Sequence, residues 1–257
     1  MSSLDWTPPA PLPASSTELE ALALVLEDSG FRAFFDEYRP QVAGVIAVRL
    51  PRPEELPPGI QACFTRKPEW NSDVVVDQLP PTLEKATDVA HEYGHAVLDT
   101  QGYPGVWPAL GYGRMAAAVV GLVQDPLVIR LLKPYFEDLK AQWEAGQRLS
   151  AARLQTVFPQ RLTPVDRTQR VLAIAETILE WRELVGDATA TGPYLYPAAE
   201  SWDMDIAVQA LELADAASVR DFSDTNATIA FVSDLRDRYG LDEWVSAPVR
   251  RGETPTD

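Results

Sequence analysis

The segment TDVAHEYGHAVLDT, residues 87–100, contains both histidines of this chain, His91 and His95, and it limits the fold more than any other feature. Residues four apart lie on one face of an α-helix, one turn above the other. On a helical wheel five small or apolar residues share one stripe: Leu83, Ala86, Ala90, Gly94 and Val97. Both histidines lie at the edge of this stripe. We therefore expect a helix from about Leu83 to Asp99 that holds the two imidazoles where a buried face meets a cleft.

Glu92 follows His91 directly and completes the pattern H-E-x-x-H. Two neutral imidazoles bind Zn²⁺ and leave coordination positions for a third protein ligand and a water. Bound zinc lowers the pKa of that water, and a nearby carboxylate can take its proton and pass it to a leaving amine. The pattern predicts His91 and His95 as zinc ligands and Glu92 as the catalytic base. The alternative is two histidines at a helix edge, with Glu92 in solvent and no metal.

The rest of the chain predicts a small sheet and many helices. Runs of β-branched residues predict strands near 43–50, 60–66 and 72–78. Thr17 and Glu20 have the spacing of a capping box at the start of the first helix, and Thr163 before Pro164 marks a later helix start. Further helical patterns lie near 112–124, 126–146, 164–186, 198–217 and 224–239.

The segment SDVVVDQLPPTLEKATDVAHEYGHAVL resembles the core of the IrrE/ImmA-like zinc peptidases. In that family a valine-rich or isoleucine-rich strand leads through a short turn into the H-E-x-x-H helix. The likeness covers residues 42–125, about a third of the chain. It implies that His91 and His95 bind the metal, that Glu92 is the base, and that a carboxylate about thirty residues further on is the third ligand.

The third ligand is where the chain departs from the family, because no glutamate lies between His95 and Glu137. Asp125 stands thirty residues after His95, and zinc accepts aspartate as well as glutamate, so we predict Asp125 as the third ligand. The alternative is that Asp125 caps a helix that begins at Pro126. Asp99 follows His95 by one turn and could orient a ligand from behind.

A rival carboxylate source is an acidic strip on one later helix, whose four members share one face: Glu176, Glu180, Glu183 and Asp187. Apolar residues cover most of the rest of that helix, so the strip could line a cleft. The segment ELVGD, residues 183–187, also looks like the E-x-x-x-D found downstream in gluzincin peptidases. Glu183 is therefore the second candidate ligand, and the alternative is a strip exposed to solvent.

These features predict an α+β, helix-dominant fold, in which a small three-stranded sheet packs on the H-E-x-x-H helix and a helical half follows. We expect three segments along the chain. Residues 1–16 are rich in proline and serine and predict a flexible start, residues 17–125 predict a zincin-like core, and residues 126–257 predict a helical region that can pack into the same domain.

Composition narrows the function. The formal charge of −16 repels phosphate, so we expect no nucleic-acid partner. No secretory signal or apolar run of membrane-spanning length is evident, and the single cysteine, Cys63, permits no intrachain disulfide, so we expect a cytoplasmic protein with no membrane partner. The combined prediction is a zinc-dependent metallopeptidase that acts on a protein or peptide substrate. The alternative is a non-catalytic zinc-binding or protein-interaction module.

Overall fold

The computed structural model describes residues 6–53, 55–56, 61–157 and 162–253, and these residues form two compact units. The first unit comprises the chain up to Tyr103 together with Leu131–Glu137 and Arg250–Glu253, and the second comprises Pro104–Arg130 and Asp138–Val249. The units are thus interleaved along the chain, whereas the sequence suggested consecutive segments. Helices dominate, and the described residues contain one small mixed sheet, so the predicted α+β, helix-dominant class is confirmed.

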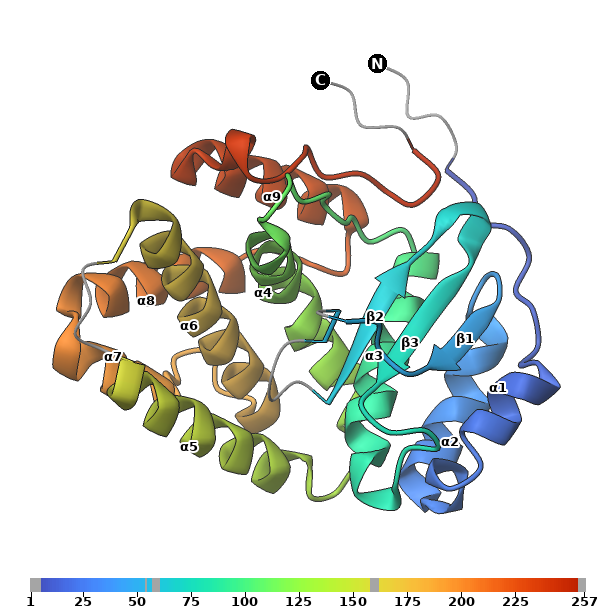
Figure 1. The fold of residues 1–257 in the computed structure, drawn as a ribbon. Helices are drawn as coiled ribbons and strands as arrows, with labels where there is room; N and C mark the ends of the chain where they lie inside the picture. Colours follow the sequence, from blue (N-terminus) through green and yellow to red (C-terminus); the bar gives the residue numbers. More distant parts are fainter. Residues whose placement is uncertain (1–5, 54, 57–60, 158–161, 254–257) are drawn as a thin grey trace. The chain divides into compact units, whose positions relative to one another are not determined.

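The sheet belongs to the first unit and has the strand order β1–β3–β2 (Figure 1). Its central strand β3 (Ser72–Val76) is parallel to β1 (Ile46–Arg49) and antiparallel to β2 (Ala62–Arg66). All five residues of β3 are buried, as expected where consecutive valines form a strand that is covered on both faces. The three predicted strands are therefore confirmed, although Ile60, at the predicted start of the second, lies outside the described residues.

The helices of the first unit are α1 (Ser16–Ala21), α2 (Ser29–Tyr38) and α3 (Ala86–Thr100), which carries the two histidines. The capping box predicted at Thr17 and Glu20 is wrong, because the box lies at Ser15 and Glu18. The Ser15 hydroxyl accepts from the Glu18 amide at 3.1 Å. Glu18 is also buried against Arg39, and this distant ion pair decides which glutamate occupies the capping position.

Part of the segment predicted to be flexible, residues 1–16, makes contacts within the first unit. Residues 1–5 lie outside the described part of the chain. From Trp6 onward the chain makes several contacts: the Trp6 ring lies 6.0 Å from the Trp70 ring, and the Leu12 amide donates to the Val42 carbonyl at 3.3 Å. These contacts fix the path of residues 6–14 before α1 begins.

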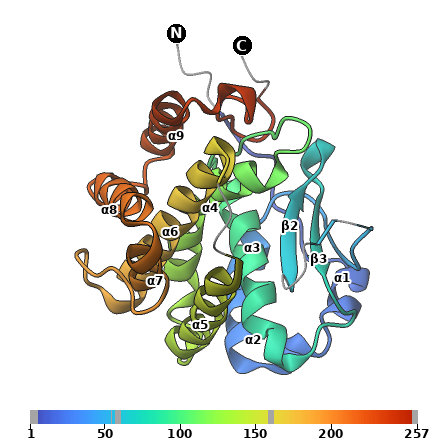
Figure 2. The same cartoon turned by 60° about the vertical axis from the view of Figure 1, so that its left-hand side comes forward.

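The second unit consists of helices, listed here in chain order: α4 (Gly113–Leu132), α5 (Leu139–Val157), α6 (Pro164–Val185), α7 (Leu195–Trp202), α8 (Met204–Ser218) and α9 (Thr225–Tyr239). The last two residues of α4 belong to the first unit. Helices α6, α7 and α8 lie side by side around a common apolar core (Figure 2). The start of α6 is as predicted, because Thr163 accepts from the Asp166 amide and Pro164 is the first helical residue.

The predicted helix break at Asp125 is wrong, because α4 runs without interruption past Pro126. An internal proline removes one backbone hydrogen bond and costs about 3 kcal/mol. Two apolar residues before Pro126 and two after it are only 0–6 % exposed: Leu122, Val123, Leu127 and Val128. Burying each such side chain contributes about 1.5–3 kcal/mol, so burial of both turns outweighs the cost of the proline. Asp125 is therefore inside a helix and is not an N-cap.

Continuity through Pro126 also makes α4 long. By length and composition alone, Gly113–Leu132 is the one helix among the described residues that could cross a membrane. The sequence suggested no such segment because no stretch of it approaches 18 uninterrupted apolar residues. In the structure 72 % of its apolar window is buried inside the protein, and the core helix of a soluble protein meets the same test.

The observed capping box generates a prediction. Ser15→Ala should lower the free energy of unfolding by about 1 kcal/mol, because the Glu18 amide loses its acceptor. Urea unfolding followed by circular dichroism measures this change. Thr17→Ala is the matched control, since Thr17 is exposed and makes no capping bond at α1. A larger loss for Thr17→Ala than for Ser15→Ala would contradict the assignment.

Candidate metal centre

The sequence of α3 separates a buried face from a partly exposed one. Ala86, Ala90, Gly94 and Val97 are buried, as the predicted stripe requires. Leu83 is 49 % exposed, because it lies in a single 3-10 turn, Leu83–Lys85, before α3 begins. His91, Glu92 and His95 are partly exposed, so all three reactive side chains lie off the buried face.

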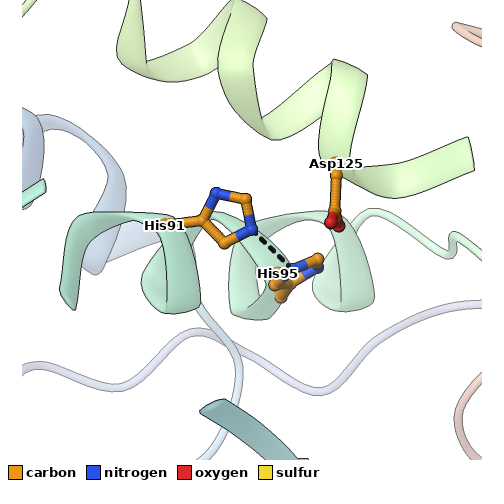
Figure 3. A group of neighbouring side chains, drawn as sticks. All are labelled: His91, His95 and Asp125. Atoms are coloured by element: carbon orange, nitrogen blue, oxygen red, sulfur yellow. Dashed lines mark hydrogen bonds between the residues drawn. The ribbon is translucent and has the colours of Figure 1, made fainter. Parts of the chain in front are cut away.

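The two imidazoles of α3 converge. The Nε2 atoms of His91 and His95 are 3.2 Å apart and the ring centroids are 4.9 Å apart (Figure 3). Two nitrogens bound to one tetrahedral zinc at about 2.0–2.1 Å lie roughly 3.3–3.4 Å apart. The separation of the ring nitrogens therefore fits a pair of ligands to a single ion. In the absence of a metal, the same distance fits one neutral ring that donates to the other.

The opposite face of α3 is anchored by a buried polar group. The Tyr93 hydroxyl donates to Glu18 at 2.8 Å, and Glu18 also accepts from Arg39 at 2.6 and 2.9 Å. Burial, and then the Glu18 charge, raise the pKa of Tyr93 well above its ordinary value, so the hydroxyl stays a donor. Because Tyr93 lies between the two histidines in sequence, this bond fixes the rotation of the helix and the direction in which the imidazoles point.

Strand β2 supplies one neighbour of His95 that the sequence did not single out. The Phe64 ring lies over His95, with centroids 6.4 Å apart and planes at 21°. Burial, and then the charge of Glu92, raise the pKa of the Cys63 thiol to about 11. Cys63 therefore remains a neutral thiol near neutral pH, whereas a metal-binding cysteine is a thiolate. Its place in a predicted strand is the only sequence signal for Phe64.

Asp99 does not orient a histidine as the sequence suggested. Its carboxylate is 1 % exposed and forms ion pairs with Arg66 at 2.6 Å and with Arg251 at 2.7 Å. Each carboxylate oxygen thus has a guanidinium partner. The one-turn spacing after His95 correctly places Asp99 on α3. Its carboxylate, however, binds Arg251 of segment 250–253 and not a histidine.

Asp125, which Figure 3 also draws, comes from α4 in the second unit. Within that unit Asp125, Glu176 and Glu180 each offer a carboxylate oxygen, and these oxygens lie within 4.8 Å of one another, close enough to hold a metal ion. Glu176 and Glu180 come from α6. The solvent-exposed strip considered as the alternative is therefore wrong for Glu180, which is 8 % exposed, and for Glu176, which is partly buried.

Two residues that sequence reasoning missed shape this carboxylate group. A Cβ atom at Gly121 would lie 2.7 Å from a Glu176 oxygen and 3.2 Å from an Asp125 oxygen, so a larger residue there would require these carboxylates to shift. The Trp143 indole donates to Glu180 at 2.9 Å. Gly121 lies one turn before Asp125, but its purpose depends on the approach of α6, and no local pattern reveals that.

Burial and mutual repulsion favour the protonated forms of the two glutamates. The pKa of Glu176 is raised well above its ordinary value by burial, then by the charges of Asp125 and Glu180. Burial, then the charge of Asp125, raise the pKa of Glu180 to about 8, and the Trp143 hydrogen bond opposes this rise. The repulsion among these carboxylates is reduced when one of them binds a proton or when a cation binds between them.

The other two members of the acidic strip lie apart from this group. Glu183 forms an ion pair with Arg130 through hydrogen bonds of 2.5 and 3.1 Å. Asp187 is exposed beyond the end of α6, where it accepts from the Thr189 amide and hydroxyl. Of the predicted ligands in this unit, the structure brings Asp125 together with Glu176 and Glu180, and Glu183 is engaged elsewhere.

The raised pKa of Glu180 predicts how stability depends on pH in the metal-free protein. The folded state holds this proton up to about pH 8, whereas the unfolded chain releases it near 4.5, so this contribution is complete below 4.5 and is lost as pH rises through 8. At about 1.4 kcal/mol per pKa unit, the loss is roughly 3–5 kcal/mol between about pH 5 and pH 9. Urea unfolding with a chelator present measures it.

Glu180→Gln should remove the part of the pH dependence that comes from Glu180, because the amide does not ionise, whereas Glu176, whose pKa is also raised, should keep its own part. Glu183→Gln is the control and should retain both parts, since Glu183 lies outside the buried group. Equal slopes of stability against pH in the native chain and in Glu180→Gln would contradict the assignment.

Comparison of the chain with protein-family models, curated proteins and solved structures finds no match. The resemblance to the IrrE/ImmA-like peptidases therefore remains a prediction from the residues around α3. The functional inference comes from two groups of side chains, a histidine pair in the first unit and a carboxylate group in the second, whose atoms are of the kinds that bind metal ions.

Proposed function

We propose that this protein is a zinc-dependent metallopeptidase that hydrolyses peptide bonds of a protein substrate. His91, His95 and Asp125 would hold the zinc ion, and Glu92 would act as the catalytic base. The observation that carries the proposal is the convergence of the two imidazole Nε2 atoms, 3.2 Å apart, on a helix whose rotation is fixed from behind by Tyr93. Glu92 follows His91 directly in the sequence and is partly exposed, as both histidines are.

The choice of Asp125 as third ligand rests on chemistry and on sequence spacing. Zinc accepts a carboxylate beside two imidazoles, and a fourth position stays open for water in catalytic sites. Asp125 is not an N-cap, so that competing explanation of the residue no longer applies. Its neighbours Glu176 and Glu180 favour a nearby cation, because three carboxylates in a partly buried group repel one another.

Each residue then has a separate task. A zinc ion held by these residues would lower the pKa of a bound water and would polarise the scissile carbonyl. Glu92 takes a proton from the attacking water and gives it to the leaving amine, so the charge of the carboxylate is restored when the products leave. Phe64 limits the movement of the His95 ring. Tyr93 and Glu18 hold the helix from behind.

A second candidate is a non-catalytic zinc module, and one observation favours it. Glu176 and Glu180 lie beside Asp125, so further carboxylates are available to complete a closed coordination shell. A structural site of that kind leaves no position for water. The position of Glu92, directly after a ligand and on the partly exposed side of α3, favours the catalytic alternative because a structural ion needs no base.

We predict that the purified chain binds about one zinc ion and that His95→Ala abolishes binding. Asp125→Asn should weaken zinc binding by at least about 100-fold, because an amide oxygen carries no charge and is a poor zinc ligand. Competition with a chromogenic chelator gives the affinity, and elemental analysis gives the stoichiometry of protein purified without a nickel column.

Glu183→Gln is the matched control for Asp125→Asn, since it makes the same chemical change in the same unit at a residue that pairs with Arg130. It should leave zinc affinity unchanged. If Asp125→Asn keeps its zinc and Glu183→Gln loses it, the third ligand is Glu183. If the native chain binds no zinc at micromolar concentration, the proposed function fails.

Glu92→Gln should retain zinc and lose peptide hydrolysis by about 100-fold or more, because the amide cannot accept the proton of water. Incubation with a peptide library derived from whole-cell protein, followed by mass spectrometry of new N-termini, provides the assay and the cleavage preference. Hydrolysis by Glu92→Gln at the native rate would support the non-catalytic module, with a contaminating peptidase as the source of activity.

A further inference from the structure

The most specific side-chain pocket outside the metal centre surrounds Arg251 in the first unit. The Arg251 side chain is buried, and its Nη1 donates to Asp99 at 2.7 Å and to the Ser72 hydroxyl at 2.8 Å. Its Nη2 donates to the carbonyls of Lys67, at 2.7 Å, and of Asn71. The guanidinium also lies over the Trp70 ring, 5.1 Å from its centroid.

This arrangement matches the geometry of a guanidinium group. Four acceptors are divided between the two terminal nitrogens, and an aromatic face covers the plane of the fork. A lysine ammonium is a single point charge with three donors, so it cannot reach all four acceptors or stack on the ring. The pocket therefore selects arginine among the cationic side chains.

The turn between β2 and β3 is built around this pocket. Glu69 and Trp70 have positive φ angles of 58° and 61°, an unfavourable conformation for residues other than glycine. The Lys67 amide closes the turn by donating to the Asn71 carbonyl at 2.8 Å. The turn thus holds two carbonyls toward one point, and positive charge at that point offsets the conformational cost.

Two features of the pocket weaken the binding of the Arg251 side chain. Arg66 shares the Asp99 carboxylate, so two guanidinium groups lie beside one negative charge. The pKa of Arg66 is lowered by burial, and the charge of Arg251 lowers it further although Asp99 opposes this. The Nε atom of Arg251 has no hydrogen-bond partner within the described part of the chain. Repulsion and an unsatisfied donor both weaken the binding of the side chain in its pocket.

We propose that Asp99, Ser72 and the Lys67–Asn71 turn form a guanidinium-binding site that the C-terminal segment fills with Arg251 as a tethered, displaceable ligand. Segment 250–253 is held in the first unit by this side chain and by the Trp6 indole, which donates to the Arg251 carbonyl at 3.0 Å. Asp99 lies in the last turn of α3, so docking of the segment orders the end of the helix that carries His91 and His95. The inference does not depend on zinc.

Chemical rescue tests this site in the full-length chain, with a chelator present so that metal plays no part. Arg251→Ala empties the pocket and should lower the unfolding temperature by about 5–10 °C, because Asp99 and the turn lose a buried partner. Millimolar methylguanidinium should recover at least half of this loss in a saturable manner. Methylammonium at the same concentration carries the same charge and should recover none of it.

Two variants serve as controls. Arg250→Ala removes the same charge from the adjacent residue, which pairs with Glu253, and should change the unfolding temperature little and show no rescue. Arg251→Lys should remain destabilised, because an ammonium cannot reach all four acceptors. Hydrogen exchange should quicken in residues 97–100 of Arg251→Ala and slow again when methylguanidinium is added.

Three results would overturn the proposal. They are an unchanged unfolding temperature in Arg251→Ala, equal rescue by the two cations, or an unfolding temperature of Arg251→Lys equal to that of the native chain. Equal rescue would mean that Arg251 supplies only charge. If Arg251→Ala does not fold in buffer, recovery of its circular dichroism spectrum with methylguanidinium but not with methylammonium supports the site, and failure with both counts against it.

Discussion

The carboxylate of Glu18 helps to set the rotation of α3, the helix that carries His91 and His95. This group is buried, and it binds both the Arg39 guanidinium and the Tyr93 hydroxyl. Removing one partner of a buried ion pair costs about 3–5 kcal/mol. The contacts among these three side chains are therefore expected to form together and to be lost together. Since Tyr93 lies between His91 and His95, rotation of α3 would break this set. The reactive face of the helix is therefore determined by contacts on its opposite face.

Local patterns in the sequence predicted what depends on local geometry. The four-residue spacing of His91 and His95 gave their convergence, the run of valines gave strand β3, and Thr163 with Pro164 gave the start of α6. Each of these follows from the period of a helix or a strand, or from the backbone groups at a helix end.

What the sequence could not give depends on distant partners. The capping glutamate is Glu18 because Arg39, 21 residues away, holds it, and α4 continues through Pro126 because its neighbours are buried. From the sequence, Glu176 and Glu180 belong to a polar strip. In the structure Gly121 lies against the Glu176 carboxylate and the Trp143 indole donates to Glu180, so both glutamates are shielded from solvent in part. Periodicity reports that a face is polar, but whether that face meets water or another carboxylate is decided by tertiary packing.

The interleaving of the two units has a consequence for synthesis on the ribosome. Residues up to Tyr103 are made before the second unit, yet the first unit also needs segment 250–253, which is made after residues 104–249. At about 5–20 residues per second, roughly 7–30 s separate the appearance of Tyr103 from that of Arg251. During this interval Asp99 has only Arg66 beside it, and the turn at Trp70 has no guanidinium to hold its carbonyls. Under the arrangement proposed for Arg251, the last turn of α3 is completed only after the second unit has been translated.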